Sequence, residues 1–99
     1  MSPDEVTFCV LLRGYGARDP PDWPGMDAVL TRMRSQHGLE PGAACYNALL
    51  EVCYRTADSD RALDVIDRMA AEGIEPDSLT LDIVARKRTW RSYMRKTFG

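Results

Sequence analysis

The sequence lacks a long apolar run, and its N-terminal stretch is not apolar either. No run approaches the roughly 20 consecutive apolar residues that a bilayer-spanning helix requires, so we expect no membrane span. The opening stretch, residues 1–5, is acidic. It has neither the apolar core of a secretory signal nor the Arg- and Ser-rich composition of a transit peptide. We therefore expect no targeting segment in this stretch.

The sequence is also poor in the residues that metal sites and catalysis need. It has a single histidine, His37, and its three cysteines, Cys9, Cys45 and Cys53, show no Cys-x-x-Cys spacing. A closed structural zinc site has no obvious ligand set, and we interpret the cysteines as small buried residues in a reducing compartment. There is also no plausible Cys–His dyad, glycine-rich phosphate loop or zinc-deaminase motif. We expect no enzyme, no cofactor, no metal and no small-molecule substrate.

Acidic residues are missing from the C-terminal end of the chain. All 15 of them precede Ile83, whereas six of the 13 basic residues follow it. Attraction to phosphate should therefore be concentrated at the C-terminal end, while the rest of the chain opposes it.

What the sequence does contain is a repeat. Leu11-Leu12 recurs 38 positions later, Arg32-Met33 recurs 36 positions later, and most of residues 38–41 recur 35 positions later. Self-similarity at this period predicts stacked helical hairpins, an all-α superhelix or solenoid. We expect one domain over residues 1–99, with repeats over 5–42 and 43–77 and a partial repeat with a basic C-terminal helix over 78–99.

Caps and breakers predict where the helices begin and end. Asp4 and Asp22 should cap the first two helices, and Asp58 or Ser59 the fourth. Gly38 should end the second helix.

A fifth helix should start near Ser78, with Leu81, Val84 and Ala85 facing inward. No Gly or Pro follows before the chain ends, so we expect this helix to continue through Trp90.

Residues 43–77 resemble the pentatricopeptide repeat without a gap, and residues 5–42 resemble a looser copy with three extra residues. Residues 3–4 are similar to the tail of a preceding unit. The residues that carry the resemblance are Tyr46-Asn47, Leu49-Leu50, Ala62-Leu63, Met69 and the closing run Gly73-Ile74-Glu75-Pro76-Asp77. The resemblance implies helical hairpins stacked in a right-handed superhelix, with the first helices lining the concave face. It also implies that one unit reads one base of single-stranded RNA.

Carried over residue by residue, the resemblance places Asn47 and Asp77 at the two base-reading positions, a pair that implies a preference for uracil. We expect the two side chains to lie together on an open concave face, because a carboxylate can orient an amide that both donates and accepts hydrogen bonds. Ala44 and Leu79 would sandwich the base. Arg55, near the end of the first helix, is positioned to meet a phosphate.

The neighbouring units depart from this pattern. Cys9 and Gly42 stand at the reading positions of the first unit and offer little hydrogen bonding, so we expect that unit to read nothing. Asp82 stands at the first reading position of the partial third unit, where its partner position falls outside the pattern. One reading site of three is therefore intact.

The basic C-terminal cluster allows three interpretations: RNA binding by phosphate contacts and aromatic stacking, a polar end-cap of the repeat array, or a docking site for a partner. Because no further hairpin follows, we expect its aromatic residues to be exposed. The candidate contact residues are Arg86, Lys87, Trp90, Arg91, Tyr93 and Arg95.

The resemblance implies an organellar RNA-binding protein of the mitochondrion or chloroplast that acts in RNA processing, stability or translation. The alternative is a structural subunit of a large organellar complex, such as a ribosome, that uses the repeats to contact protein. Two hairpins bury only a small apolar core, most of the chain has an excess of acidic residues, and one reading site gives little affinity for RNA. These three features favour the alternative.

Overall fold

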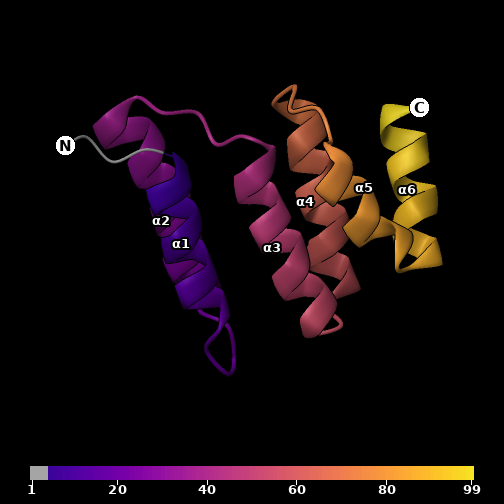
Figure 1. Cartoon of the computed structure of the whole chain (residues 1–99), viewed down its shortest axis with the longest axis horizontal. Coiled ribbons are helices and arrows are strands. Elements are labelled where there is room, and N and C mark those ends of the chain that lie inside the picture. The colour runs from indigo at the N-terminus through magenta and orange to yellow at the C-terminus, as the bar shows by residue number, and fades with distance from the viewer. Residues whose placement is uncertain (1–4) are drawn as a thin grey trace.

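The computed structural model describes residues 5–99, which form six helices and no strand (Figure 1). Their bounds are α1 (Glu5–Gly16), α2 (Trp23–His37), α3 (Ala43–Arg55), α4 (Ser59–Ala71), α5 (Ser78–Ala85) and α6 (Arg88–Phe98). Consecutive helices pair as three hairpins, because α1 packs on α2, α3 on α4, and α5 on α6. The predicted all-α solenoid of hairpins is confirmed. Within the described range, no helix combines the length and the hydropathy that crossing a bilayer requires.

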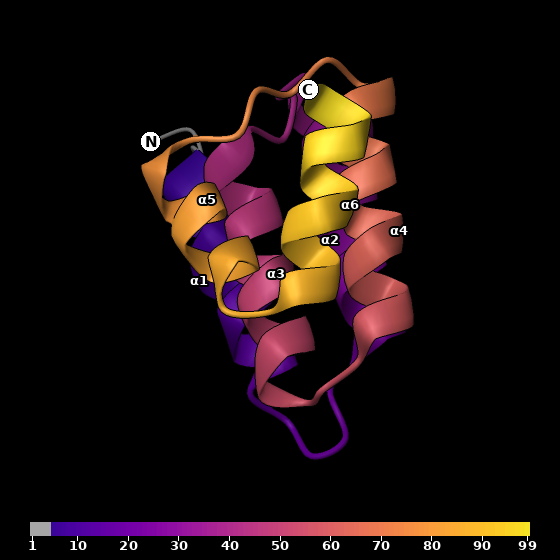
Figure 2. The same cartoon turned by 90° about the vertical axis from the view of Figure 1, so that its right-hand side faces the viewer.

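The hairpins are stacked in two layers (Figure 2). The first helices α1, α3 and α5 form one layer, in which α3 contacts both neighbours, and the second helices α2, α4 and α6 form the other. The stack measures 40 × 30 × 19 Å. The central position of α3 explains why residues 45–50 are buried along their whole length. A helix that is covered on several sides is apolar nearly all round.

Local signals set most of the helix ends. Asp22 accepts a hydrogen bond from the Gly25 N–H at 3.0 Å, and Asp58 accepts one from the Arg61 N–H at 3.2 Å, as expected of N-caps. Gly38 ends α2 in the left-handed conformation, with φ of 62°. The predicted cap Asp4 and the preceding Pro3 lie outside the described residues.

The C-terminal end differs from the prediction of one continuous fifth helix, which is wrong. The chain turns at Lys87, whose extended backbone (φ −127°, ψ 125°) separates α5 from α6. α6 then packs against both α5 and α4 and completes a third, short hairpin. A continuous helix would leave Trp90 and Met94 in water, whereas the turn buries both. Burial of this apolar area outweighs the helix propensity of the two turn residues.

The turn also changes which side of α5 faces inward. Ile83 and Val84 are buried, as is Thr80, whereas Leu81 is 52% exposed and Ala85 is exposed. The expected inward face was therefore right for Val84 and wrong for Leu81 and Ala85. The buried side of α5 differs from the expected one because this helix has to pack against both α3 and α6.

A polar network fastens the first hairpin to the second. The ring of Tyr46 in α3 is fully buried, and its hydroxyl donates to the carboxylate of Glu72, the residue that follows α4. Arg34 of α2 donates to the Tyr46 oxygen at 3.3 Å and also to Glu72. Burial, with the bond to Glu72, raises the pKa of Tyr46 to about 12. Burial alone would raise the pKa of Glu72, but the bonds from Tyr46 and Arg34 outweigh it and lower that pKa.

This network predicts a specific pH dependence of stability. Because the Glu72 pKa is lower in the folded protein than its ordinary value of 4.5, the ionised carboxylate stabilises the fold above that value. The contribution disappears as the pH falls through the lowered, folded-state pKa. We therefore expect wild type to lose stability more steeply below pH 4.5 than Glu72→Gln does, as measured by urea midpoints during acidification. The control Glu75→Gln, in the exposed loop after α4, should retain the wild-type slope; equal slopes for wild type and Glu72→Gln would refute the assignment.

Candidate nucleic-acid interface

The side chains of Asn47 and Asp77 lie together where α3 meets the start of α5. The amide nitrogen Nδ2 of Asn47 donates to Oδ1 of Asp77 at 3.0 Å. The hydroxyl of Thr80 donates to the other amide atom, Oδ1 of Asn47. Both atoms of the amide group therefore have partners, and the orientation of the amide is set by its two neighbours on α5.

Asp77 is held in place by the helix that it begins. Its Oδ1 accepts the Thr80 N–H at 2.9 Å, while the Thr80 hydroxyl oxygen accepts the Asp77 N–H at 3.1 Å, so the two residues form a capping box. The Thr80 N–H and then the Asn47 amide lower the pKa of Asp77. The site thus presents a stable negative charge at neutral pH.

Exposure divides the site into a floor and a rim. Asn47 is only 1% exposed and Thr80 is fully buried, so these two form the floor. Asp77 is exposed, as are Leu79 (39% exposed), near the start of α5, and Ala44, one turn before Asn47 on α3. The expectation that Asn47 itself is openly presented is wrong, because α5 packs over it. A base would meet the rim first.

Arg55 lies at the C-terminal end of α3 and is exposed, but one of its donors is in use. Its Nη2 donates to the carbonyl oxygen of Gly16, the last residue of α1. A guanidinium carries five N–H donors, so this contact leaves others for a phosphate. Arg55 consequently both joins two hairpins and remains available to an anion.

The C-terminal cluster does not form one continuous surface. Trp90 is fully buried, and its indole N–H donates to the Ser59 hydroxyl at 3.1 Å, so the expectation that it is exposed is wrong. Tyr93 is half-buried and donates to Asp67 at 2.6 Å. The physical reason is that α6 folds back onto α4, and this brings its apolar face into the core.

The basic side chains of the cluster remain on the surface. Arg86 pairs with Asp82 at 3.3 Å and also lies over the ring of Tyr54, 5.2 Å from its centre, while the Lys87 ammonium lies 5.6 Å from the same centre. Arg91 and Arg95 are exposed on α6. Phosphate could therefore reach the arginines of α6, but aromatic stacking on Trp90 is excluded in this fold.

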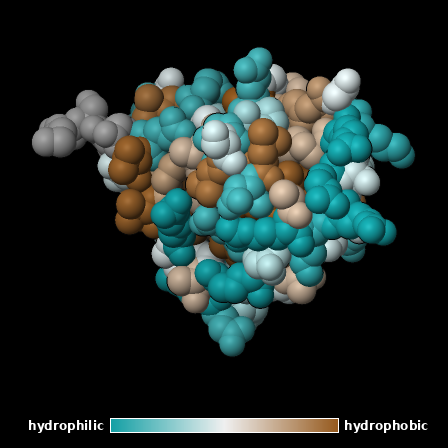
Figure 3. Space-filling model, turned by 45° about the vertical axis from the view of Figure 1, so that its right-hand side comes forward, coloured by the Kyte–Doolittle hydropathy of each residue, from teal (hydrophilic) through white to brown (hydrophobic). Residues whose placement is uncertain are grey.

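Figure 3 shows hydrophobic and hydrophilic side chains interspersed on one side of the molecule. The large apolar residues that remain exposed are Val6, Val10, Leu11, Tyr54, Leu79, Leu81 and Phe98. Those on α1 and those on α5 and α6 belong to the two ends of the stack of hairpins.

Sequence reasoning placed Asn47 beside Asp77 but overlooked Thr80. The signal was present, because a hydroxyl residue three positions after an N-cap Asp can complete a capping box. The Arg34–Tyr46–Glu72 network was also overlooked, since its three members come from α2, α3 and the residue after α4 and share no local pattern.

Comparison with known proteins agrees with the fold of stacked helical hairpins. A pentatricopeptide repeat domain model matches residues 28–84. A chloroplastic pentatricopeptide repeat-containing protein of Arabidopsis thaliana is 30% identical over 77 residues, which cover 78% of this chain. The match spans 10% of the length of that relative. With its three stacked hairpins and a domain match over more than half of its length, this chain belongs to the pentatricopeptide repeat family.

Proposed function

We propose that this chain binds single-stranded RNA in an organelle, with Asn47 and Asp77 selecting uracil at the second repeat. The observation that carries the proposal is the 3.0 Å hydrogen bond between these two side chains, in the repeat that matches the family pattern without a gap. Family membership supports a role in organellar RNA processing, stability or translation. The name of the relative favours the chloroplast over the mitochondrion.

The geometry suggests how a base is held. Ala44, one turn before Asn47, and Leu79, two residues after Asp77, are exposed apolar residues that would contact the base, and Asp77 is exposed between α3 and α5. For Asn47 to touch the base, its amide must turn outward and exchange the Thr80 contact for one with the base edge. Arg55, with Arg91 and Arg95 on α6, would supply phosphate contacts, which position the strand without selecting its sequence.

The experiment replaces Asp77 by serine and measures the ratio of affinities for oligouridine and oligoadenosine of equal length. Serine still caps α5, because its hydroxyl accepts a backbone N–H as the aspartate does, so the fold is retained. The carboxylate that orients Asn47 is lost. We expect the uridine preference to fall by about fivefold or more, which corresponds to roughly 1 kcal/mol of base discrimination.

The matched control is Asp58→Ser, which alters the N-cap of α4 in the same way, away from the reading pair. Because each variant removes one negative charge, both should change overall RNA affinity similarly, and only Asp77→Ser should change the ratio. Equal ratios in wild type and Asp77→Ser would exclude base reading at this repeat.

The structural-subunit role is the second candidate, and exposed apolar side chains at both ends of the stack favour it. Val6 and Val10 on α1 are 69% and 63% exposed, and Leu81 on α5 is 52% exposed. Solenoids bury such end faces against further repeats, caps or partners. If neither oligouridine nor oligoadenosine binds measurably at low salt, contact with protein is the function that remains.

A further inference from the structure

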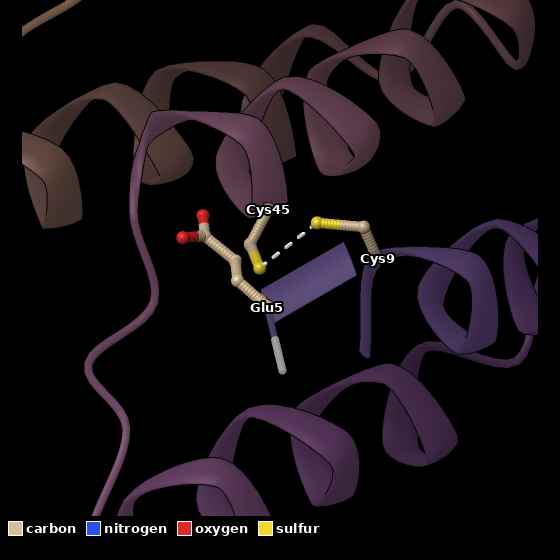
Figure 4. Close-up of side chains that lie close together, drawn as sticks. All are labelled: Glu5, Cys9 and Cys45. Carbon is tan, nitrogen blue, oxygen red and sulfur yellow. Dashed lines mark hydrogen bonds between the residues drawn. The ribbon is translucent and has the colours of Figure 1, made fainter. Parts of the chain in front are cut away.

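We propose that Glu5, Cys9 and Cys45 form a binding site for a single thiophilic divalent cation of the zinc class. The three side chains come together between the first two repeats, and Figure 4 shows them converging from α1 and α3. Their ligand atoms all lie within 4.8 Å of one another. Neither family membership nor the proposed RNA contacts require this cluster.

The two sulfur atoms are already close to the spacing that a metal needs. Sγ of Cys9 lies 3.2 Å from Sγ of Cys45, although the residues are 36 positions apart. Two thiolates on a tetrahedral zinc, each about 2.3 Å from the metal, are separated by about 3.8 Å. The thiols therefore need to separate only slightly, a change that side-chain rotation can supply.

The carboxylate distinguishes this cluster from an ordinary pair of buried cysteines. Glu5 lies one turn before Cys9 on α1, so both side chains point toward the start of α3. Its Oε1 accepts the Gly42 N–H at 3.2 Å, which fixes the orientation of the carboxylate. A hydrogen bond of this kind, from a group that is not itself a ligand, orients a metal ligand toward the ion.

The surroundings complete the site. Met33 Sδ lies 4.0 Å from Cys45 Sγ and adds a third soft atom on the buried side. On the opposite side, a pocket of about 290 Å³ is lined by Glu5, Cys9, Arg13 and Ala44, among others, and gives a cation a path from solvent. A ligand set of two sulfurs and one oxygen favours zinc-like ions over magnesium or calcium.

Cys9 differs from the residue at the matching position of the second hairpin. Cys9 occupies the place in the first hairpin that Asn47 occupies in the second. No local spacing in the sequence links Glu5 and Cys9 to Cys45, because Cys45 is 36 positions from Cys9. A bound ion would link α1 to α3 and so hold the first hairpin against the second.

The test is titration of reduced, chelator-treated protein with Co²⁺, which reports sulfur ligation through charge-transfer absorption. We expect one Co²⁺ per chain, displaced by Zn²⁺, with the absorption lost in Cys45→Ala. Glu5→Gln, which leaves the core unchanged, should weaken binding at least about tenfold and abolish the rise in melting temperature that Zn²⁺ causes. The matched control is Cys53→Ala, since Cys53 is a buried thiol of α3 outside the cluster. It should bind like wild type.

Three results would overturn the proposal. The first is the absence of charge-transfer absorption in folded wild type. The second is undiminished binding in both Cys45→Ala and Glu5→Gln. The third is binding that Cys53→Ala weakens as much as Glu5→Gln does, which would place the ion outside this cluster.

Discussion

Trp90→Ala should lower the free energy of unfolding by about 3–5 kcal/mol, a large share of the total for a domain of this size. Trp90 is fully buried and is the largest of the buried side chains, so its removal leaves a cavity where α6 packs on the second hairpin, beside Ser59 and Tyr54. It also leaves the Ser59 hydroxyl without the indole N–H that it accepts at 3.1 Å. Urea unfolding followed by circular dichroism measures the loss directly.

The control for this prediction is Phe98→Ala on the same helix. Phe98 is 37% exposed, so its truncation creates less cavity and should cost clearly less stability than the loss of Trp90. If the two variants were equally stable, α6 would not be folded back on α4. The exposed aromatic end predicted from sequence would then be the better description.

Asn47→Ala should lower the free energy of unfolding by about 1–3 kcal/mol, even in the absence of RNA. The amide satisfies the buried Thr80 hydroxyl and donates to Asp77, and it joins α3 to α5 without contact with water. Alanine removes both contacts and raises the pKa of Asp77, which the Asn47 amide helps to lower. Thermal or urea unfolding at neutral pH measures the effect.

A double-mutant cycle with Thr80→Val separates the network from simple truncation. If Asn47 acts through the Thr80 hydroxyl, the two substitutions together should cost less than the sum of the single losses, by about 0.5–3 kcal/mol. Strict additivity would mean that the contact contributes nothing. Thr80→Ser, which retains the hydroxyl, should show most of the wild-type coupling.

The sequence was sufficient for the parts of the site that depend on local order. The 35-residue pattern placed Asn47 and Asp77 in one unit, and helix geometry brings the two ends of such a unit together. The predicted start of the fifth helix near Ser78 agrees with the structure, in which Asp77 caps α5. What periodicity did not indicate was how deeply α5 covers Asn47, because exposure depends on the angle at which neighbouring hairpins pack.

The C-terminal end shows the opposite case. The absence of Gly and Pro between Ser78 and Phe98 predicted one helix, yet the chain turns at Lys87. Helix propensities differ by only a few tenths of a kcal/mol per residue, whereas burying a large side chain gains several times more. A local pattern therefore could not decide between a long exposed helix and a short helix folded onto α4.

The sequence by itself determined that the chain forms hairpins of helices and which residues cap α2 and α4, because these features depend mainly on residues a few positions apart. Only the tertiary structure decided that α6 turns back, that Trp90 belongs to the core, and that Glu5 meets Cys9 and Cys45. These contacts join separate helices, and the burial that favours them exists only once the hairpins have stacked.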